Sequence, residues 1–426
     1  DLHNPAHSFP TRRSSDLQAD QALNPASVMK LVTTYAALDL LGPAFTWDTP
    51  VYLDTTPVAG RLRGNVYIQG RGDPKLVVER LWLLMRRLRA LGIDAIDGDI
   101  VLDRSAFALP AHDAADFDGE PWRPYNAAPD ALLLNYKAVA MGFTPDTAAG
   151  VAHVRYEPPL ARLQLPATVP LAPAGTACGD WRMGLQAELT HAERIAFQGA
   201  YPAACGAREW SVAPSDPSGY AARAVEGMWR ELGGRLAGRV RDGQVPAGLQ
   251  PAYSNPSPPL AEVVRDINKH SNNVMTQLLL LTLGLQKAGQ GSFDAARGVL
   301  AQWWQERLGP TDQPVVDNGA GLSRAARLSP RALARMLQQA WASPVMPEFV
   351  ASLPIVGVDG TLRRRPALVS GAAHLKSGSL RDVTALAGYV LAASGQRYVL
   401  VAMVNHPNAG AARPALDALI AWSAAD

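Results

Sequence analysis

The sequence at residues 24–30, NPASVMK, reads as the beginning of a helix. Asn24 can cap this helix, and Pro25 suits its first turn because a missing N–H costs nothing there. Gly42 is a typical residue for the end of the same helix. Between these limits, apolar residues recur at helical spacing, at Val28, Leu31, Val32, Tyr35, Leu38 and Leu41. The pattern therefore predicts a helix whose first turn carries Ser27.

Ser27 and Lys30 lie three residues apart, so the predicted helix places them on one face near its N-terminus. A hydroxyl there lies at the positive end of the helix dipole and has an amine one turn away. This arrangement suits a nucleophilic serine whose proton is taken by a lysine. Both residue types are common, however, and a Ser-x-x-Lys pair on its own is better explained as an ordinary exposed pair.

Two later stretches change that interpretation. Residues 271–273, SNN, open another apolar helical run, and residues 376–379, KSGS, lie in a segment that reads as a strand. Ser-x-x-Lys, Ser-x-Asn and Lys-(Thr/Ser)-Gly in this order are the signature of penicillin-binding proteins and serine β-lactamases. Position 271 follows position 27 by 244 residues, far more than in β-lactamases. The chain therefore resembles the class C penicillin-binding proteins, the penicillin-binding protein 4-like D-alanyl-D-alanine carboxypeptidase/endopeptidase branch (peptidase family S13).

The resemblance implies an acyl-transfer site built from the three motifs. Ser27 would be the nucleophile and Lys30 its base, although a free lysine, with a pKa near ~10.4, holds its proton at neutral pH. Burial or a second cation must lower that pKa, and Lys376 can supply the cation. Ser271 would relay a proton to the leaving amine. Asn273 would hold the backbone amide of the substrate.

The resemblance also implies the groups that bind the substrate. Lys376 and Ser377 would bind its terminal carboxylate, which gives specificity for a free C-terminus. The backbone N–H groups of Ser27 and Ser379 would stabilise the oxyanion, and Gly378 completes this motif. Ser377 stands where threonine is commoner, but it keeps the hydroxyl. This chemistry uses no cofactor and no metal.

Three further stretches bear on the resemblance. Residues 317–323, DNGAGLS, and residues 359–362, DGTL, are similar to two other blocks of the family, and they fit either a lining of the site or simple turns. Some class C members use an aspartate of an inserted domain to hold the diaminopimelate side chain of the peptide. Residues 121–126, PWRPYN, contain no aspartate. Either the register differs there or this chain recognises the side chain in another way.

The implied fold is an α/β (α+β) multidomain one: a transpeptidase-like domain with an antiparallel sheet flanked by helices, plus inserted mainly-β domains. We expect residues 18–65 and 240–426 to form the first domain, and residues 66–239 to form one insertion or two, one of them nested. Strands near 45–53 and 65–69 would share the antiparallel sheet with the C-terminal strands. Those are expected at 375–380, 385–393 and 398–406. Helices are expected at 76–91, 218–232, 260–268, 273–285, 293–308, 330–341 and 411–425.

Two further predictions concern the origin of the N-terminal residues and the compartment in which the protein works. Residues 7–17, HSFPTRRSSDL, read like the translation of a common sequencing adapter, so we expect residues 1–17 to be an assembly artefact. The chain would then be a fragment whose signal peptide is lost. Cys178 and Cys205 flank a segment that reads as paired strands. A disulfide between them would fit an oxidising compartment such as the periplasm, and two buried free thiols are the alternative.

Composition excludes several other classes of function. Hydrophobic residues make up 48% and charged residues 18% of the 426 residues, as expected of a globular chain. A formal charge of +2 is too small to favour nucleic acid as a partner. No apolar run reaches the roughly 18 residues of a membrane span. CxxC, HExxH and histidine-rich zinc patterns do not occur in the sequence.

The sequence therefore predicts a serine D-Ala-D-Ala carboxypeptidase/DD-endopeptidase that forms an acyl-enzyme with peptidoglycan stem peptides in the periplasm. Penicillins and other β-lactam antibiotics would acylate Ser27, because the strained lactam mimics the D-Ala–D-Ala amide. One alternative is a β-lactamase or esterase on the same scaffold. Another is a catalytically silent cell-wall binding module, against which Ser27, Lys30, Ser271, Asn273 and Lys376 all argue.

Overall fold

A computed structural model describes residues 17–365, 369 and 371–425, so all but the last residue of the predicted adapter segment lies outside the described residues. The chain divides into two compact units, each described by itself below. Among the described residues, unit 1 holds those up to Thr46, Phe107–Leu109 and those from Pro258 onward, and unit 2 holds Trp47–Ala106 and Pro110–Ser257. These boundaries lie nearer in sequence to the first and second motifs than the expected limits at residues 65 and 240 do.

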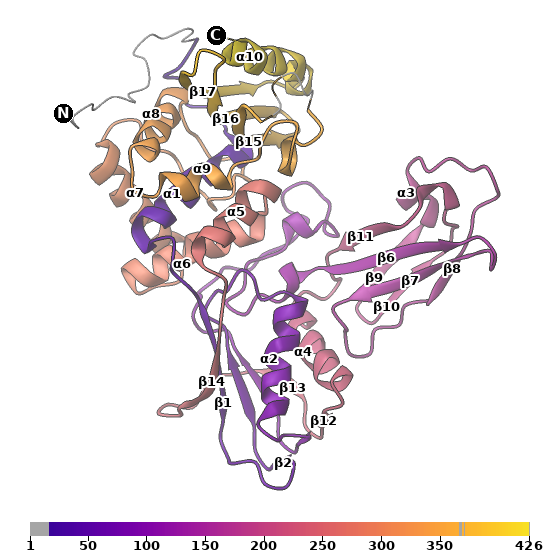
Figure 1. Cartoon of the computed structure of the whole chain (residues 1–426). Coiled ribbons are helices and arrows are strands. Elements are labelled where there is room, and N and C mark those ends of the chain that lie inside the picture. Colours follow the sequence, from indigo (N-terminus) through magenta and orange to yellow (C-terminus); the bar gives the residue numbers. More distant parts are fainter. Residues whose placement is uncertain (1–16, 366–368, 370, 426) are drawn as a thin grey trace. The chain divides into compact units, whose positions relative to one another are not determined.

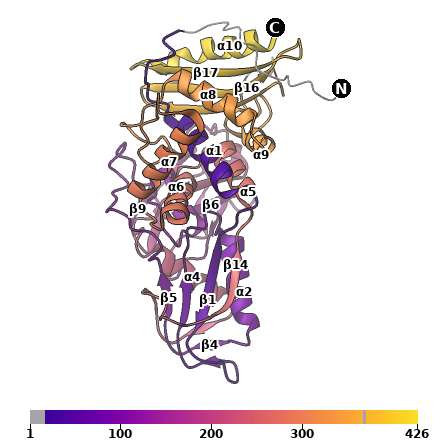
Figure 2. The same ribbon diagram turned by 90° about the vertical axis from the view of Figure 1, so that its left-hand side faces the viewer.

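Unit 1 is built on an antiparallel sheet with strand order β15-β16-β17. The strands are β15 (Ala373–Leu380), β16 (Val383–Leu391) and β17 (Arg397–Asn405). Helix α10 (Arg413–Ala425) covers one face, and α8 (Pro330–Trp341) covers the other (Figures 1 and 2). Alternation along β16 explains the two faces: Leu386 packs in the core with Ile420 of α10, whereas the Tyr389 hydroxyl donates to the Leu337 carbonyl of α8 at 2.7 Å. The expected C-terminal strands and last helix are confirmed.

The remaining helices of unit 1 pack against one another and against this sheet. Helix α6 is buried almost all round, since its apolar run leaves no polar face to expose. In the described part of the chain, no helix is both long and apolar enough to cross a membrane. These elements are η1 (Ala26–Met29), α1 (Lys30–Leu41), α5 (Leu260–His270), α6 (Asn273–Ala288), α7 (Phe293–Leu308), α9 (Met346–Ser352), η5 (Gly360–Leu362) and η7 (Ala409–Ala412).

Unit 2 contains a five-stranded mixed sheet with the order β13-β5-β3-β1-β14. Its strands are β1 (Asp48–Leu53), β3 (Val66–Gln69), β5 (Ile100–Asp103), β13 (Val240–Asp242) and β14 (Pro251–Pro256). Strand β1 pairs with β14 and β3, so the expectation that the strands near 45–53 and 65–69 join the C-terminal sheet is wrong. Strand β14 begins and ends with a proline, Pro251 and Pro256. Its prolines are tolerated because β14 lies at the edge of the sheet.

A second group of strands in unit 2 lies, in sequence, between β5 and β13. It comprises an antiparallel sheet of order β11-β6-β7-β8 and the hairpin β9–β10. The predicted disulfide is confirmed: Cys178 and Cys205 are bonded. The position of this group of strands between β5 and β13 in the sequence supports the proposal that one insertion is nested in another. The strands are β6 (Val139–Asp146), β7 (Val151–Glu157), β8 (Thr168–Pro170), β9 (Ala187–His191), β10 (Arg194–Phe197) and β11 (Arg208–Val212).

The helices and short strands of unit 2 complete its core. Helices α2 and α4 confirm the expected helices, and their apolar faces pack in one core with the five-stranded sheet. The helices are α2 (Val78–Ala90), α3 (Trp181–Leu185), α4 (Tyr220–Glu231), η2 (Pro124–Asn126), η3 (Asn135–Lys137) and η4 (Ala203–Cys205). Strands β2 (Arg61–Leu62), β4 (Ala95–Ile96) and β12 (Arg235–Leu236) form a small parallel sheet.

Candidate active site

The turn that presents Ser27 is held from several sides. The Asn24 side chain accepts a bond from the Ala26 N–H at 2.9 Å, although the cap position itself falls on Pro25. The Asn24 N–H donates to the Asn405 side chain of β17 at 2.7 Å. Ala26 has φ +47°, a conformation that is uncommon for residues other than glycine. The backbone before Ser27 is therefore fixed in an unusual conformation by contacts far away in the chain.

Lys30 is fully buried and has three oxygen partners. Its Nζ lies 3.1 Å from Ser27 Oγ, 2.7 Å from Asn273 Oδ1 and 2.6 Å from the Ala320 carbonyl. The amide oxygen of Asn273 and the carbonyl of Ala320 can only accept. A neutral Lys30 has two N–H donors and one lone pair, so these two oxygens take both donors. The lone pair is then left for the Ser27 hydroxyl.

Ser271 lies on the joint between two helices. It follows the last residue of α5 with φ +57°, and Asn272 caps α6 by accepting from the Met275 N–H at 3.1 Å. Asn273 is the first residue of α6, from which its side chain reaches Lys30. One short joint therefore delivers both the serine and the asparagine of the second motif to the site.

Lys376 is the second fully buried lysine. It lies on β15, and its Nζ donates to Ser271 Oγ and to the Ser377 carbonyl, each at 2.8 Å. The register pairs Lys376 with Ala387 and Ser377 with Leu386. Because Lys376 and Ser377 are consecutive in β15, their side chains point to opposite faces of the sheet. Lys376 thus joins the third motif to the second.

Burial governs the protonation of both lysines. The pKa of Lys30 is lowered well below its ordinary value, first by burial and second by the charge of Lys376. Burial lowers the pKa of Lys376 to about 7. A lysine that loses its proton near neutral pH can act as a base, which an exposed lysine cannot do efficiently.

Two glycines allow the backbone of the serine turn to approach its neighbours. A Cβ on Gly378 of β15 would lie 2.6 Å from the Pro25 carbonyl and 3.1 Å from the Ser27 nitrogen. A Cβ on Gly321 would lie 1.8 Å from the Ala26 carbonyl, and Gly321 has φ +77°. Glycine is therefore required at both positions. Neither close approach follows from the sequence pattern alone.

The two additional family-like blocks both contact site residues. Residues 317–323 supply the Ala320 carbonyl that bonds Lys30, and the Thr33 hydroxyl donates to the Gly319 carbonyl at 2.9 Å. In residues 359–362, the Thr361 hydroxyl lies 2.8 Å from the Ser377 hydroxyl. These blocks are therefore more than simple turns. Ser379, the last residue of the third motif, is exposed near the end of β15, the strand that carries Ser377.

The structure brings the three motifs together in unit 1. The side chains of Ser27, Lys30 and Asn273 form one bonded group, and those of Ser271 and Lys376 form another. The profile of the D-Ala-D-Ala carboxypeptidase 3 (S13) family matches residues 12–425. The chain belongs to this family. It is therefore a serine peptidase of the D-Ala-D-Ala carboxypeptidase kind.

Individual proteins are also similar to this chain. A D-alanyl-D-alanine carboxypeptidase of Actinomadura sp. (strain R39) is 29% identical over 94% of this chain and 76% of its own length. The carboxypeptidase DacB of Haemophilus influenzae is 25% identical over 90% of this chain and 81% of its own length. The crystal structure of penicillin binding protein 4 (dacB) from H. influenzae has the same fold, with a TM-score of 0.75, 24% identity and coverage of 96% of this chain and 93% of that one.

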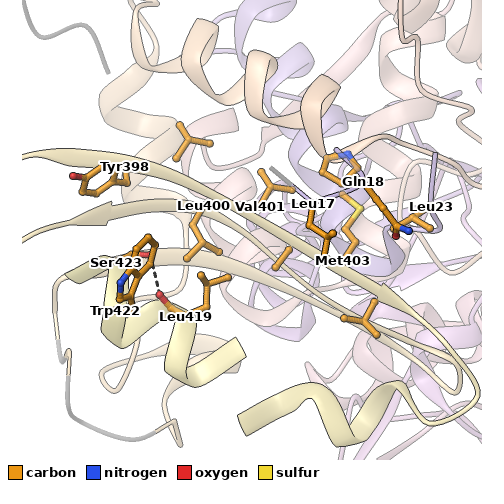
Figure 3. Close-up of a pocket in the computed structure, with 14 residues that line it drawn as sticks. Leu17, Gln18, Leu23, Tyr398, Leu400, Val401, Met403, Leu419, Trp422 and Ser423 are labelled. Carbon is orange, nitrogen blue, oxygen red and sulfur yellow. Dashed lines mark hydrogen bonds between the residues drawn. The ribbon is translucent and has the colours of Figure 1, made fainter. Parts of the chain in front are cut away.

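A pocket of about 380 Å³ in unit 1 lies away from the S13 motifs (Figure 3). Its walls come from β17 and α10, with Leu400, Met403 and Trp422 among the side chains. Its lining includes none of the predicted catalytic or substrate-binding residues. Strand β16 separates β17 from β15, which carries the third motif.

Gly378→Ala should lower activity on a D-Ala-D-Ala peptide by about 10²-fold, because a shift of about 1 Å in the reacting groups costs that much. The added methyl group would collide with the Pro25 carbonyl and displace β15 from the Ser27 turn. Gly142→Ala is the matched control, since this strand glycine has open space around its missing Cβ. Equal activity of the two variants in a D-alanine release assay would contradict the close approach.

Proposed function

We propose that Ser27 attacks the carbonyl carbon of the D-Ala–D-Ala bond and that Lys30 takes the Ser27 proton. The bonds of Lys30 carry this proposal, since Asn273 and Ala320 occupy its N–H groups and leave its lone pair for Ser27. The new bond joins Ser27 Oγ to the carbonyl carbon, and the oxyanion is stabilised by the N–H groups of Ser27 and Ser379.

In the next step the C–N bond breaks and D-alanine leaves. We propose that Ser271 gives its proton to the leaving amine and is reprotonated by Lys376, whose ammonium donates to Ser271 Oγ at 2.8 Å. The proton that Lys30 took from Ser27 replaces the one that Lys376 lost, so both lysines return to their starting states. Water then attacks the acyl-enzyme with the neutral Lys30 as the base, and this proton passes to Ser27 Oγ as the acyl bond breaks, which restores Ser27. Lys376 and Ser377 are assigned to the terminal carboxylate, and Asn273 to the peptide backbone.

The proposed substrates are peptidoglycan stem peptides, as free chains or as cross-links. β-Lactams would acylate the same Ser27, and a structure of the H. influenzae protein is a complex with a β-lactam. We infer that the protein works in the periplasm. The disulfide between Cys178 and Cys205 supports an oxidising compartment, because disulfides persist there.

The decisive assay measures D-alanine release from a muramyl pentapeptide, beside cleavage of a cross-linked peptide dimer. We expect release of D-alanine, and the dimer gives the carboxypeptidase-to-endopeptidase ratio. Absence of turnover on both substrates would favour a silent binding module. Rapid deacylation after penicillin treatment would favour a β-lactamase instead.

The proposal fixes how acylation depends on pH. Acylation by penicillin should rise with pH as Lys30 loses its proton, with the rise well below pH 10.5, because burial and the charge of Lys376 lower the pKa of Lys30. Lys376→Met removes a positive charge near Lys30, so the pKa of Lys30 should be higher in this variant. The increase in acylation rate should therefore occur at a higher pH than in the unaltered protein. At any pH on the rising part of the profile the variant is therefore slower.

The control for this pH profile is Lys287→Met, which removes an equal charge at an exposed position at the end of α6. Its profile should match that of the unaltered protein. A profile of Lys376→Met that stays in place or moves to lower pH would show that the two lysines are not coupled in this way.

A further inference from the structure

Lys269 is a buried lysine that belongs to none of the three motifs, two residues before Ser271. Its Nζ donates to the Leu353 carbonyl at 2.6 Å and to Asp359 Oδ2 at 2.7 Å. The other oxygen of Asp359 accepts from the Ile355 N–H at 2.8 Å. The ion pair therefore ties the last turn of α5 to the loop between α9 and η5.

The residue after Asp359, which is the first of η5, brings its backbone against α5. Gly360 has φ +56°, and a Cβ there would lie 2.7 Å from the Lys269 carbonyl. Thr361 follows, and Leu362 is buried in the core beneath α10. The ion pair of Asp359 therefore fixes the chain just before Thr361, and the buried Leu362 fixes it just after. The Thr361 hydroxyl lies 2.8 Å from the Ser377 hydroxyl.

We propose that Thr361 is the second hydroxyl of the subsite for the terminal carboxylate, positioned there by the ion pair of Lys269 and Asp359. This inference rests on the proposed function, which assigns Ser377 to that carboxylate. If Thr361 donates to Ser377, the Ser377 proton turns outward to the ligand. If Ser377 donates to Thr361, the Thr361 proton does so. Either way the pair presents a donor that its partner strengthens.

Exposure and charge are consistent with this role. Thr361 is exposed and Ser377 is partly exposed, so a ligand can reach both hydroxyls. Burial acts to raise the pKa of Asp359, but bonds from the Ile355 N–H and Lys269 hold it below its ordinary value. Asp359 is therefore charged at neutral pH, and its bonds with Lys269 and Ile355 persist there.

The test compares two ligands in the Ser27→Ala protein, where no turnover occurs. One is a peptide ending in D-Ala-D-Ala with a free carboxylate, and the other is the same peptide with a terminal carboxamide. Thr361→Val should weaken binding of the carboxylate peptide about tenfold, as expected for loss of a hydrogen bond to a charged group, and leave the carboxamide peptide within about twofold. Thr361→Ser should restore carboxylate binding. Equal loss for both peptides, or no loss, would overturn the inference.

Asp359→Asn tests the positioning pair, and Lys269→Met is a second variant. Each should reduce the preference for the carboxylate, and Asp359→Asn combined with Thr361→Val should reduce it no further than Thr361→Val alone. A merely structural role would weaken both peptides alike. Penicillin labelling of the unaltered protein separates the two levels of inference: labelling at Ser27 with an unchanged ligand preference in Thr361→Val refutes only the role of Thr361. Absence of labelling at Ser27 refutes the proposed function itself.

Discussion

Ser27→Ala is expected to carry no covalently bound penicillin even after long exposure to the drug. In the proposed mechanism the acyl bond forms at Ser27 Oγ, and this hydroxyl lies 3.1 Å from the lysine assigned as its base. Alanine removes one oxygen from a partly buried side chain, so the fold should be retained, as a melting curve can show. Peptide mapping by mass spectrometry of the labelled, unaltered protein should place the drug on the peptide containing Ser27.

The rival nucleophile is Ser271, because its hydroxyl contacts the other buried lysine, Lys376, at 2.8 Å. Drug found on Ser271, in either protein, would reverse the assignment of nucleophile and relay. Ser394→Ala provides a matched control, since Ser394 is exposed in the turn between β16 and β17. This control should be labelled like the unaltered protein.

Lys30→Met is expected to slow acylation by about 10³-fold, within the usual contribution of a general base. Methionine fills a similar volume at this buried position but has no lone pair for the Ser27 proton. It also leaves the Asn273 amide oxygen and the Ala320 carbonyl without the Lys30 donor. The rate is measured as time-resolved incorporation of labelled penicillin.

A melting curve of Lys30→Met must accompany the rate, because unpaired buried acceptors typically cost about 1–3 kcal/mol each. Lys287→Met, at an exposed position, controls for loss of a lysine in general. A folded Lys30→Met protein that acylates at the original rate would show that another group takes the proton.

The sequence predicted which residues meet in the candidate site better than it predicted the architecture around them. Motif order and spacing predicted which of Ser27, Lys30, Ser271, Asn273 and Lys376 to look for, and the structure places them in two bonded groups. Helical periodicity predicted the longer helices of unit 1, because their burial follows local spacing, but not the short α9. The sequence offered either burial or a second cation as the cause of a lowered Lys30 pKa, and burial is the larger cause.

Features that depend on distant partners could not be predicted. The sequence pattern does not reveal the pairing of β1 with β14, because Pro251 and Pro256 obscure the strand pattern of β14. In addition, β1 and β14 lie about 200 residues apart in the chain. The role of Lys269 depends on Asp359, a partner that no local pattern reveals. Gly378 was predicted from its motif, but its necessity arises from the Pro25 carbonyl, which only the folded chain brings close.

The complete burial of Lys30 and Lys376 has a consequence for the durability of the protein. Since the pKa of Lys376 falls to about 7 on folding, the unfolded chain binds more protons than the folded one between there and 10.5. The free energy of unfolding therefore decreases as the solution becomes more acidic across that interval. At these two positions the protein is less stable than it could be, and the buried lysines serve its catalytic activity instead. Selection for heat resistance alone would replace both lysines with apolar residues, and only turnover would retain them.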